Sequence, residues 1–301
     1  MYDFNSYTEA RSIGEAVGIL CANPNARVIS GGTDILIKLR SQDEAFVGRD
    51  LVGITRIPQL SGIAAGADGT ITIGAATSFT QIERNDIVAR HLGSLVKAAA
   101  SVGGPQVRNT GTIGGNIANG ATSADTAGVL FTYDAMLVIH GRDGVREVPV
   151  TEFYAGPGKV KLQQGELLAA IKIAREDYEG YCGSYIKFAV RNAMDIATLG
   201  CAVLVRQNGS MNGMIEDLRI AFGVAGPTPL RATSAEQLAK GKPITDELLE
   251  QVGEKCLEST NARDSWRAAK AFRQQLIRVL PQRAIRQALG IEGGDGIARK
   301  N

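Results

Sequence analysis

The chain reads Val28-Ile29-Ser30-Gly31-Gly32-Thr33-Asp34-Ile35-Leu36 near its start, where a short β-branched run meets a glycine pair and then a second apolar run. This order predicts a strand over 27–29, a glycine turn, and another regular element over 35–39. Glycine pairs let the backbone approach a ligand closely, because no Cβ stands in the way. The stretch therefore predicts a binding loop at the end of a strand.

A second glycine-rich stretch covers residues 107–125 and contains Thr112-Ile113-Gly114-Gly115-Asn116. It is too rich in glycine for a core helix and too polar for a buried strand, so we expect a loop. In both stretches, unhindered N–H groups beside Thr, Asn and Asp side chains predict a concave anion site that suits a pyrophosphate without a lysine. Glycine pairs alone often build only tight turns, but two such polar loops favour a dinucleotide ligand.

Neither glycine stretch matches GxxxxGK[ST] or GxGxxG, so nothing local supports a P-loop or a Rossmann fold. Asp125 is either a surface carboxylate or an acceptor for a ligand hydroxyl or the loop backbone, and spacing does not choose between these. Lys187 and Arg191 are either solvated charges on a strand or cations beside a ligand ring. Trp266 lies in a helical run, and we expect it to pack in the core.

Composition narrows the class of protein. The 301 residues include 33 Lys and Arg and 31 Asp and Glu, so the net charge is close to zero. Such a balance does not indicate a surface that binds nucleic acid or a membrane. The first residues lack an apolar h-region and no run of 18 apolar residues exists, which predicts a cytoplasmic protein without membrane insertion. Four isolated cysteines and two histidines are too few for a metal site in this chain alone. Redox chemistry would need an organic cofactor or a partner's metal.

Hydrophobic periodicity predicts an α+β fold with a boundary in the polar run over 176–183. Residues 51–76 read as a small sheet with tight turns. Helices are expected over 12–23, 91–102, 236–240, 246–256 and 266–289. Strands are expected over 135–140, 145–150, 167–173, 184–191, 197–205 and 218–224. The second domain therefore looks like an antiparallel sheet faced by helices.

The two glycine stretches together resemble the FAD-loop signature of molybdenum hydroxylase flavoprotein subunits, which include those of bacterial xanthine dehydrogenases and aerobic carbon monoxide dehydrogenases. The resemblance continues through YDFNSY at 2–7, GPGK at 156–159, MDIATLGCA at 194–202 and FGVAGPTPLRA at 222–232. It thus covers nearly the whole chain and is greatest to the xanthine dehydrogenase type.

This resemblance implies a vanillyl-alcohol-oxidase (PCMH) type FAD-binding domain of two subdomains over 1–176, a carbon monoxide dehydrogenase flavoprotein C-terminal domain over 177–290, and a tail over 291–301. FAD is expected to be non-covalent, because neither loop contains histidine or cysteine. Besides residues 28–35, the implied FAD contacts are Val102, Gly103, Thr112, Gly114, Gly115, Asn116, Asn119, Asp125, Leu168 and Lys187. Asp195 and Ile196 match the loop where NAD would approach.

The implied partners are a molybdopterin-binding large subunit, which hydroxylates a substrate such as a purine, and a small subunit with [2Fe–2S] clusters. Electrons would cross these clusters to FAD and leave to NAD or another acceptor, so no catalytic side chain is required here. A stand-alone vanillyl-alcohol-type flavin oxidase is the alternative, but the small C-terminal domain and the lack of histidines argue against it. The intact glycine loops argue against a scaffold that has lost FAD.

Overall fold

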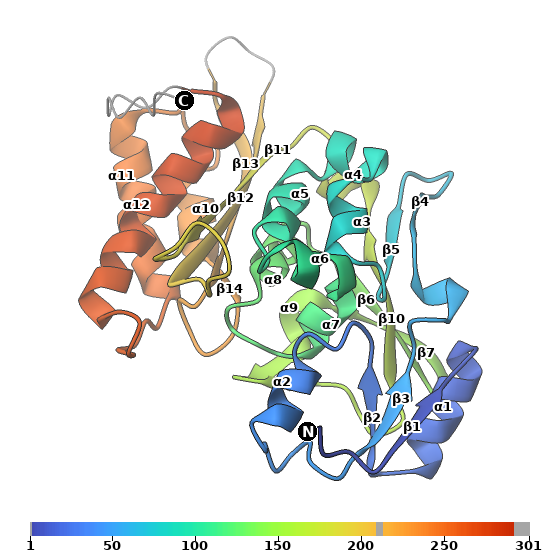
Figure 1. The fold of residues 1–301 in the computed structure, drawn as a ribbon. Helices are drawn as coiled ribbons and strands as arrows, with labels where there is room; N and C mark the ends of the chain where they lie inside the picture. Colours follow the sequence, from blue (N-terminus) through green and yellow to red (C-terminus); the bar gives the residue numbers. More distant parts are fainter. Residues whose placement is uncertain (1, 209–212, 292–301) are drawn as a thin grey trace.

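The structure, a computed structural model, describes residues 2–208 and 213–291, in which helices pack on four β-sheets (Figure 1). Beyond Ile291, the predicted tail lies outside the described residues. Within the described ranges, no helix is both long and apolar enough to cross a membrane. The same residues contain no group of three or more His, Cys, Asp or Glu side chains that could hold a metal ion.

The first sheet is parallel, with the strand order β1-β3-β2. Its strands are β1 (Ser6–Glu9), β2 (Ala26–Ile29) and β3 (Asp50–Gly53). Helix α1 (Ile13–Ala22) connects β1 to β2, and Ser12 caps it by accepting a hydrogen bond from the Glu15 N–H at 3.1 Å. Helix α2 (Ile35–Arg40) follows the glycine turn.

The expected single small sheet over 51–76 is wrong. Strand β3 is the buried centre of the parallel sheet and pairs with β1 and β2 on its two sides. After the 3-10 turn Pro58–Leu60, β4 (Ile63–Ala65) and β5 (Ile71–Gly74) pair with each other in a different sheet. Local alternation predicts strands but does not choose their partners, which here are set by burial.

This second sheet is antiparallel, with the order β4-β5-β10-β6-β7. The predicted strands over 135–150 and 167–173 are confirmed as β6 (Met136–Gly141), β7 (Gly144–Pro149) and β10 (Leu167–Ile173). A short hairpin joins β8 (Tyr154–Gly156) to β9 (Lys159–Val160). Several short helices share a core with the sheet: α3 (Phe79–Glu83), α4 (Asp86–His91), α5 (Gly93–Ala100), α7 (Ile113–Ala118), α8 (Asp125–Thr132) and α9 (Val150–Phe153). Helix α6 (Pro105–Thr110) has no buried residue and packs against α3.

The prediction of a loop over 107–125 is wrong, because α6, α7 and the start of α8 occupy this stretch. Thr112 caps α7 through its hydroxyl. Gly114 is buried, and a Cβ added there would lie 2.6 Å from the carbonyl oxygen of Ala75. The glycine does not prevent helix formation here. It lets a short helix touch the backbone of the segment after β5.

The C-terminal domain is an antiparallel sheet faced by helices, as predicted. It follows the 3-10 turn Arg175–Asp177. Its strands are β11 (Cys182–Phe188), β12 (Leu199–Gln207), β13 (Ile215–Gly223) and β14 (Leu230–Arg231). Its helices are α10 (Thr233–Ala239), α11 (Asp246–Cys256) and α12 (Lys270–Leu289), with a 3-10 turn at Leu257–Ser259.

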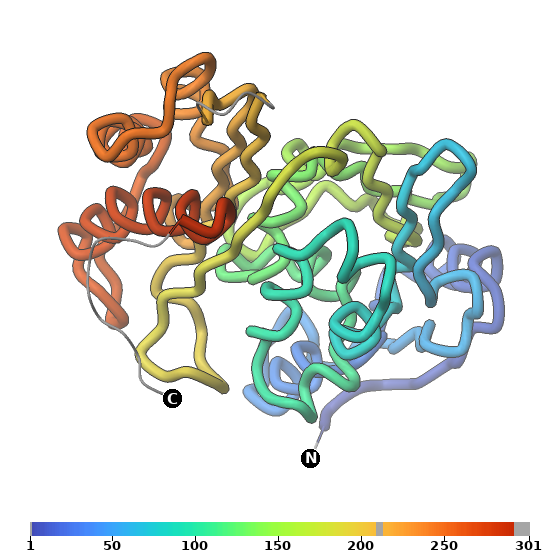
Figure 2. Tube along the Cα trace, turned by 90° about the horizontal axis from the view of Figure 1, so that it is seen from above, coloured from blue at the N-terminus to red at the C-terminus, as the bar shows by residue number. Residues whose placement is uncertain are grey.

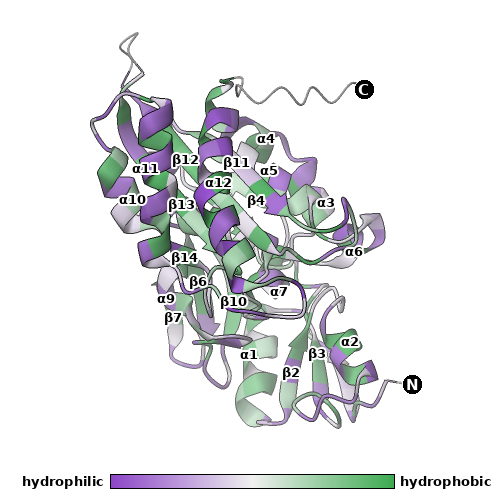
Figure 3. Ribbon diagram, turned by 90° about the vertical axis from the view of Figure 1, so that its left-hand side faces the viewer, coloured by the Kyte–Doolittle hydropathy of each residue, from purple (hydrophilic) through white to green (hydrophobic). Residues whose placement is uncertain are grey.

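Both faces of the C-terminal sheet are covered. Helices α10 and α12 pack on one face, while α5 and α8 of the N-terminal domain pack on the other. Buried on both sides, β12 is apolar throughout from Leu199 to Val205, and Figure 3 shows this apolar sheet behind the helices. The sheet is therefore also the interface between the two domains, and it brings β11 next to the start of α8.

Candidate functional site

The two glycine stretches lie against each other. The Thr112 hydroxyl donates to the Ser30 hydroxyl oxygen at 3.3 Å, although the two residues are 82 positions apart. A Cβ added to Gly31 would overlap the carbonyl oxygen of Thr110, so only glycine permits this approach. In Figure 1 the turn between β2 and α2 accordingly faces α7. The contact forms a continuous surface from two distant parts of the sequence.

The first stretch leaves backbone donors available. Among the described residues, no atom accepts a hydrogen bond from the N–H groups of Gly31, Gly32, Thr33 or Asp34. Gly32 adopts the left-handed conformation with φ of 73°, which suits glycine and turns the chain sharply. Successive unpaired N–H groups in such a turn are a typical anion site. This part of the predicted pyrophosphate site therefore has the required donors.

The glycine pair of the second stretch differs, because the N–H groups of Gly114, Gly115 and Asn116 are used within the chain. Gly114 N donates to the Ala75 carbonyl at 2.8 Å, Gly115 N to the Thr112 hydroxyl at 3.3 Å, and Asn116 N to the Thr112 carbonyl at 3.0 Å. Gly114, Gly115 and Asn116 therefore do not supply the free N–H donors that the sequence predicted for them. Gly115 is exposed, and a Cβ added there would meet only the Thr112 hydroxyl, at 3.0 Å. This glycine contributes open space rather than donors.

Three side chains, Asp34, Lys38 and Asn119, connect the two stretches at the edge of the candidate site, which we call the rim. Lys38 Nζ lies 2.7 Å from Asp34 Oδ2 and donates to Asn119 Oδ1 at 2.7 Å. Asn119 Nδ2 donates to Asp34 Oδ1 at 3.1 Å, which closes the triangle. Lys38 was not among the predicted site residues, because the predicted anion site needed no lysine. The i, i+4 spacing from Asp34 on a short helix was the available signal.

Asp125 is neither a surface carboxylate nor a ligand of the loop backbone. It is buried at the first position of α8 and is 8% exposed. The Tyr185 hydroxyl donates to its Oδ1 at 2.7 Å, and Lys187 Nζ lies 2.8 Å from its Oδ2. Burial raises the pKa of Asp125, and the contacts with Lys187 and Tyr185 act in the opposite direction.

Lys187 is not a solvated charge, since only 13% of its side chain is exposed. Besides Asp125, its ammonium group contacts the backbone carbonyl of Ser101 at 2.9 Å. The segment after β11 reaches the same place, because Met194 N donates to the Gly103 carbonyl at 3.2 Å. Figure 2 shows this yellow segment between the C-terminal domain and the teal helices of the N-terminal domain. The structure thus brings Lys187 next to residues 101–103 at the domain interface.

Other predicted site residues lie close to this interface or in the core. Val102 and Gly103 are half-buried beside Ser101, whereas Leu168 is buried within β10. Asp195 accepts hydrogen bonds from the N–H groups of Arg191 and Ile196, both at 2.9 Å, and Ile196 is exposed. Arg191 itself is exposed, so its solvated alternative holds.

The expected core packing of Trp266 is wrong. The side chain is 85% exposed, and the Arg267 guanidinium lies 4.0 Å from its ring centroid. Helix α12 begins only at Lys270, so the helical periodicity was extended too far toward the N-terminus. Arg267 also reaches Asp195 at 3.9 Å, which ties this segment to the loop between β11 and β12.

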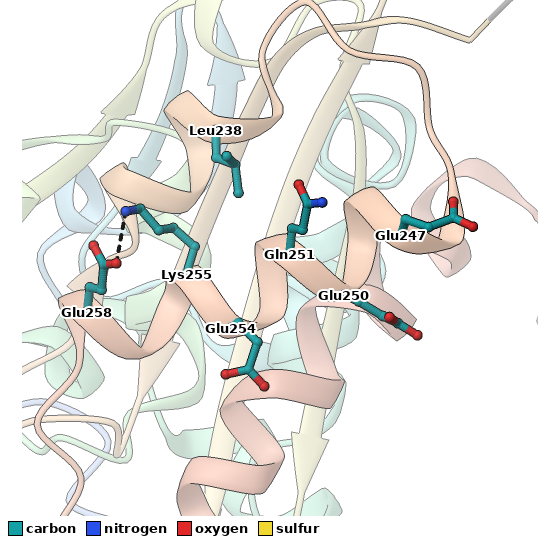
Figure 4. A pocket seen from close by; sticks show the side chains of 7 residues that line it. All are labelled: Leu238, Glu247, Glu250, Gln251, Glu254, Lys255 and Glu258. Atoms are coloured by element: carbon teal, nitrogen blue, oxygen red, sulfur yellow. Dashed lines mark hydrogen bonds and ion pairs between the residues drawn. The ribbon is translucent and has the colours of Figure 1, made fainter.

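A depression on α10 and α11 is a poor site for a dinucleotide (Figure 4). Its lining includes four glutamates, Glu247, Glu250, Glu254 and Glu258. The one lysine of the lining, Lys255, is paired with Glu258 at 2.8 Å. Such an acidic lining repels phosphate groups. The paired glycine stretches are therefore the better candidate.

Comparisons with known proteins identify the family of each part of the chain. Residues 2–175 match the family described as FAD binding domain in molybdopterin dehydrogenase, and residues 184–288 match the CO dehydrogenase flavoprotein C-terminal domain. The xanthine dehydrogenase FAD-binding subunit of Escherichia coli O157:H7 is 44% identical over 98% of this chain and 99% of its own length. The carbon monoxide dehydrogenase medium chain of Hydrogenophaga pseudoflava is 31% identical over 94% of this chain and 96% of its own.

A solved structure of carbon monoxide dehydrogenase from Hydrogenophaga pseudoflava has a similar fold, with a TM-score of 0.90 at 30% identity. The match covers 97% of this chain and 100% of the other. Together these similarities confirm the predicted α+β fold class, in which an FAD-binding domain precedes a carbon monoxide dehydrogenase flavoprotein C-terminal domain. They also confirm FAD as the cofactor of the N-terminal domain.

Proposed function

Since the chain belongs to the family of FAD-binding subunits of molybdenum hydroxylases, we propose that it is the electron exit of such an enzyme. In this proposal a molybdopterin-binding large subunit oxidises the substrate, and a small subunit carries the electrons over [2Fe–2S] clusters to this chain. The chain then passes them to NAD or another acceptor. Bound FAD supplies the redox chemistry, and the protein supplies binding and placement.

The paired glycine stretches carry this proposal. Four successive N–H groups, from Gly31 to Asp34, have no acceptor within the described residues, and Gly115 faces open space next to them. Unpaired donors and an absent Cβ are what a pyrophosphate needs from a backbone. We propose that FAD is held non-covalently there by residues 28–35 with Thr112, Gly114, Gly115, Asn116, Asn119 and Asp125.

The flavin ring is proposed to lie at the domain interface. Val102, Gly103, Leu168 and Lys187 would line it, and the contact of Lys187 with Ser101 supports this placement. The exposed loop with Asp195 and Ile196 would be the side on which NAD approaches. The domain limits proposed for this arrangement are 1–176 and 177–290.

The enzyme type is proposed to be xanthine dehydrogenase-like, acting in purine metabolism as part of a heterotrimer. The 44% identity with a xanthine dehydrogenase FAD-binding subunit over nearly the full length of both chains supports this type. We also propose that the chain works in the cytoplasm. Its four unpaired cysteines, of which Cys182 is exposed, are compatible with a reducing compartment.

The test is to purify the chain from its native source with whatever co-elutes and to record the visible spectrum, the metal content and NADH formation with xanthine. Flavin bands with iron and molybdenum in the same peak, together with NAD reduction, are the expected result. Flavin in a metal-free single chain that oxidises a substrate unaided would instead establish a stand-alone oxidase.

A further inference from the structure

A buried tyrosine lies behind the proposed flavin site. Tyr185 is in β11 of the C-terminal domain and is 8% exposed. Its hydroxyl donates to Asp125 Oδ1 at 2.7 Å, across the domain interface. Burial and the adjacent Asp125 carboxylate raise the pKa of Tyr185 well above its ordinary value, so the phenol keeps its proton and remains a donor. Sequence patterning gave this residue no role.

The same carboxylate fixes the position of a cation. Asp125 Oδ2 lies 2.8 Å from Lys187 Nζ, and the two side chains are only 8% and 13% exposed. Lys187 also donates to the Ser101 carbonyl at 2.9 Å, beside the 102–103 segment. Because both side chains are buried from solvent, the interaction between their charges is strong, and neutralising one partner leaves the charge of the other uncompensated.

We propose that Tyr185 is a positioning residue that sets the redox potential of bound FAD through Asp125 and Lys187. The inference rests on the proposed function, because it takes the flavin ring to lie beside Lys187. Tyr185 acts by keeping Asp125 ionised, so that the carboxylate cancels most of the positive charge of Lys187. Tyr185 therefore keeps the potential of the cofactor low.

The direction of the effect follows from charge. Reduction of FAD by two electrons and one proton adds one negative charge, so a nearby uncompensated cation favours the reduced form. Without the Tyr185 hydroxyl, the buried Asp125 carboxylate loses a donor and takes up a proton more readily. Lys187 then loses its counter-charge. The midpoint potential should rise.

The chain offers a matched control. Tyr133 is also buried, at 2% exposure, and its hydroxyl shares a hydrogen bond with the Ser94 hydroxyl at 2.9 Å. Its only hydroxyl partner within the described residues is this uncharged serine. Tyr133→Phe removes a buried hydroxyl and one hydrogen bond without changing a charge pair. It therefore reproduces the loss of stability expected for Tyr185→Phe but not its electrostatic effect.

The experiment is spectroelectrochemical titration, with mediators, of the FAD-loaded full chain. Tyr185→Phe is expected to shift the oxidised-to-reduced ratio at a fixed potential about tenfold toward reduced FAD, or about 30 mV for a two-electron couple. Tyr133→Phe should leave the midpoint potential unchanged, whereas both variants should lower the melting temperature. Lys187→Met should lower the potential, because it removes the cation beside the ring. In an Asp125→Asn background Tyr185→Phe should have no further effect, because the carboxylate through which it acts is gone.

Equal shifts in Tyr185→Phe and Tyr133→Phe overturn the inference, and so does a Tyr185→Phe shift that persists in the Asp125→Asn background. Asp125→Asn supplies a second variant should Tyr185→Phe fail to fold, and it must also raise the potential. If wild-type chain binds no FAD, the proposed function fails and the inference with it. If FAD binds normally and the potential does not respond, only the inference fails.

Discussion

Gly115→Val should separate cofactor binding from folding. Gly115 is exposed on α7, and a Cβ built there meets only the Thr112 hydroxyl, at 3.0 Å. The hydroxyl must give by a few tenths of an ångström, which a side chain can do. The added isopropyl group then fills the open space beside the first glycine stretch. A ligand phosphate that needs this space is excluded.

The magnitudes have different origins. Valine is slightly better than glycine within a helix, by a few tenths of a kcal/mol, so the free energy of unfolding of the FAD-free chain should change by less than about 1 kcal/mol. Overfilling a packed contact costs about 1–3 kcal/mol. At about 1.4 kcal/mol per tenfold, the FAD dissociation constant should rise between about fivefold and about 140-fold.

The assay is a titration of the FAD-free chain with FAD, followed by quenching of flavin fluorescence, together with urea unfolding of the same samples. Gly18→Val is the matched control, because Gly18 is exposed on α1 and a Cβ there has nothing within 4 Å. It should leave FAD affinity unchanged. Wild-type affinity in Gly115→Val would refute the placement of the phosphate between the two stretches.

Gly31→Ala should weaken FAD binding and also destabilise the fold by about 1–3 kcal/mol, since its Cβ overlaps the Thr110 carbonyl and forces the two stretches apart; melting temperature and FAD titration measure the two effects. Lys38→Met should raise the FAD dissociation constant by up to about fivefold, the usual worth of partly exposed ion pairs, and 0.5 M salt should reduce the difference from wild type. A larger defect unaffected by salt would contradict the charge argument. Hydrogen bonds with Arg146 are the main reason why the pKa of the Glu166 carboxylate is lowered from 4.5 in the folded chain. The ionised carboxylate therefore stabilises the fold at pH values above its pKa in the unfolded chain. This stabilisation is lost as the pH falls through its pKa in the folded chain. Melting curves of Glu166→Gln and wild type should therefore differ at pH 7 and converge at acid pH.

Local patterns in the sequence determined much of the secondary structure. The strands over 135–150 and 167–173 are short runs rich in apolar residues next to turns, and the structure reproduces them. Helix α11 was predicted with its observed bounds, Asp246–Cys256, and in the structure the Thr245 side chain caps it. Each of these signals acts within a few residues, so neighbouring residues suffice to detect it.

The predictions that were wrong depend on residues that are distant in the sequence or on where an element begins. Residues 107–125 were read as a loop because glycines disfavour helices, but Gly114 is there for its contact with Ala75, which is 39 positions away in the chain. Strand β3 was assigned to a local sheet because its partners β1 and β2 cannot be identified from alternation. The core position expected for Trp266 came from periodicity extended past the true start of α12.

The sequence by itself determined the cofactor class, because the two glycine-rich stretches, their polar neighbours and the family signature can all be recognised without a structure. Only the tertiary structure decided how the site is built. It showed that the N–H groups of Gly31 to Asp34 are free within the described residues whereas those of Gly114, Gly115 and Asn116 are not. It also showed that Lys38 contacts Asn119 and that Asp125 contacts Tyr185 and Lys187. These are contacts between side chains 60 to 81 positions apart, or between backbones, and they depend on distance and burial, which only the folded chain defines.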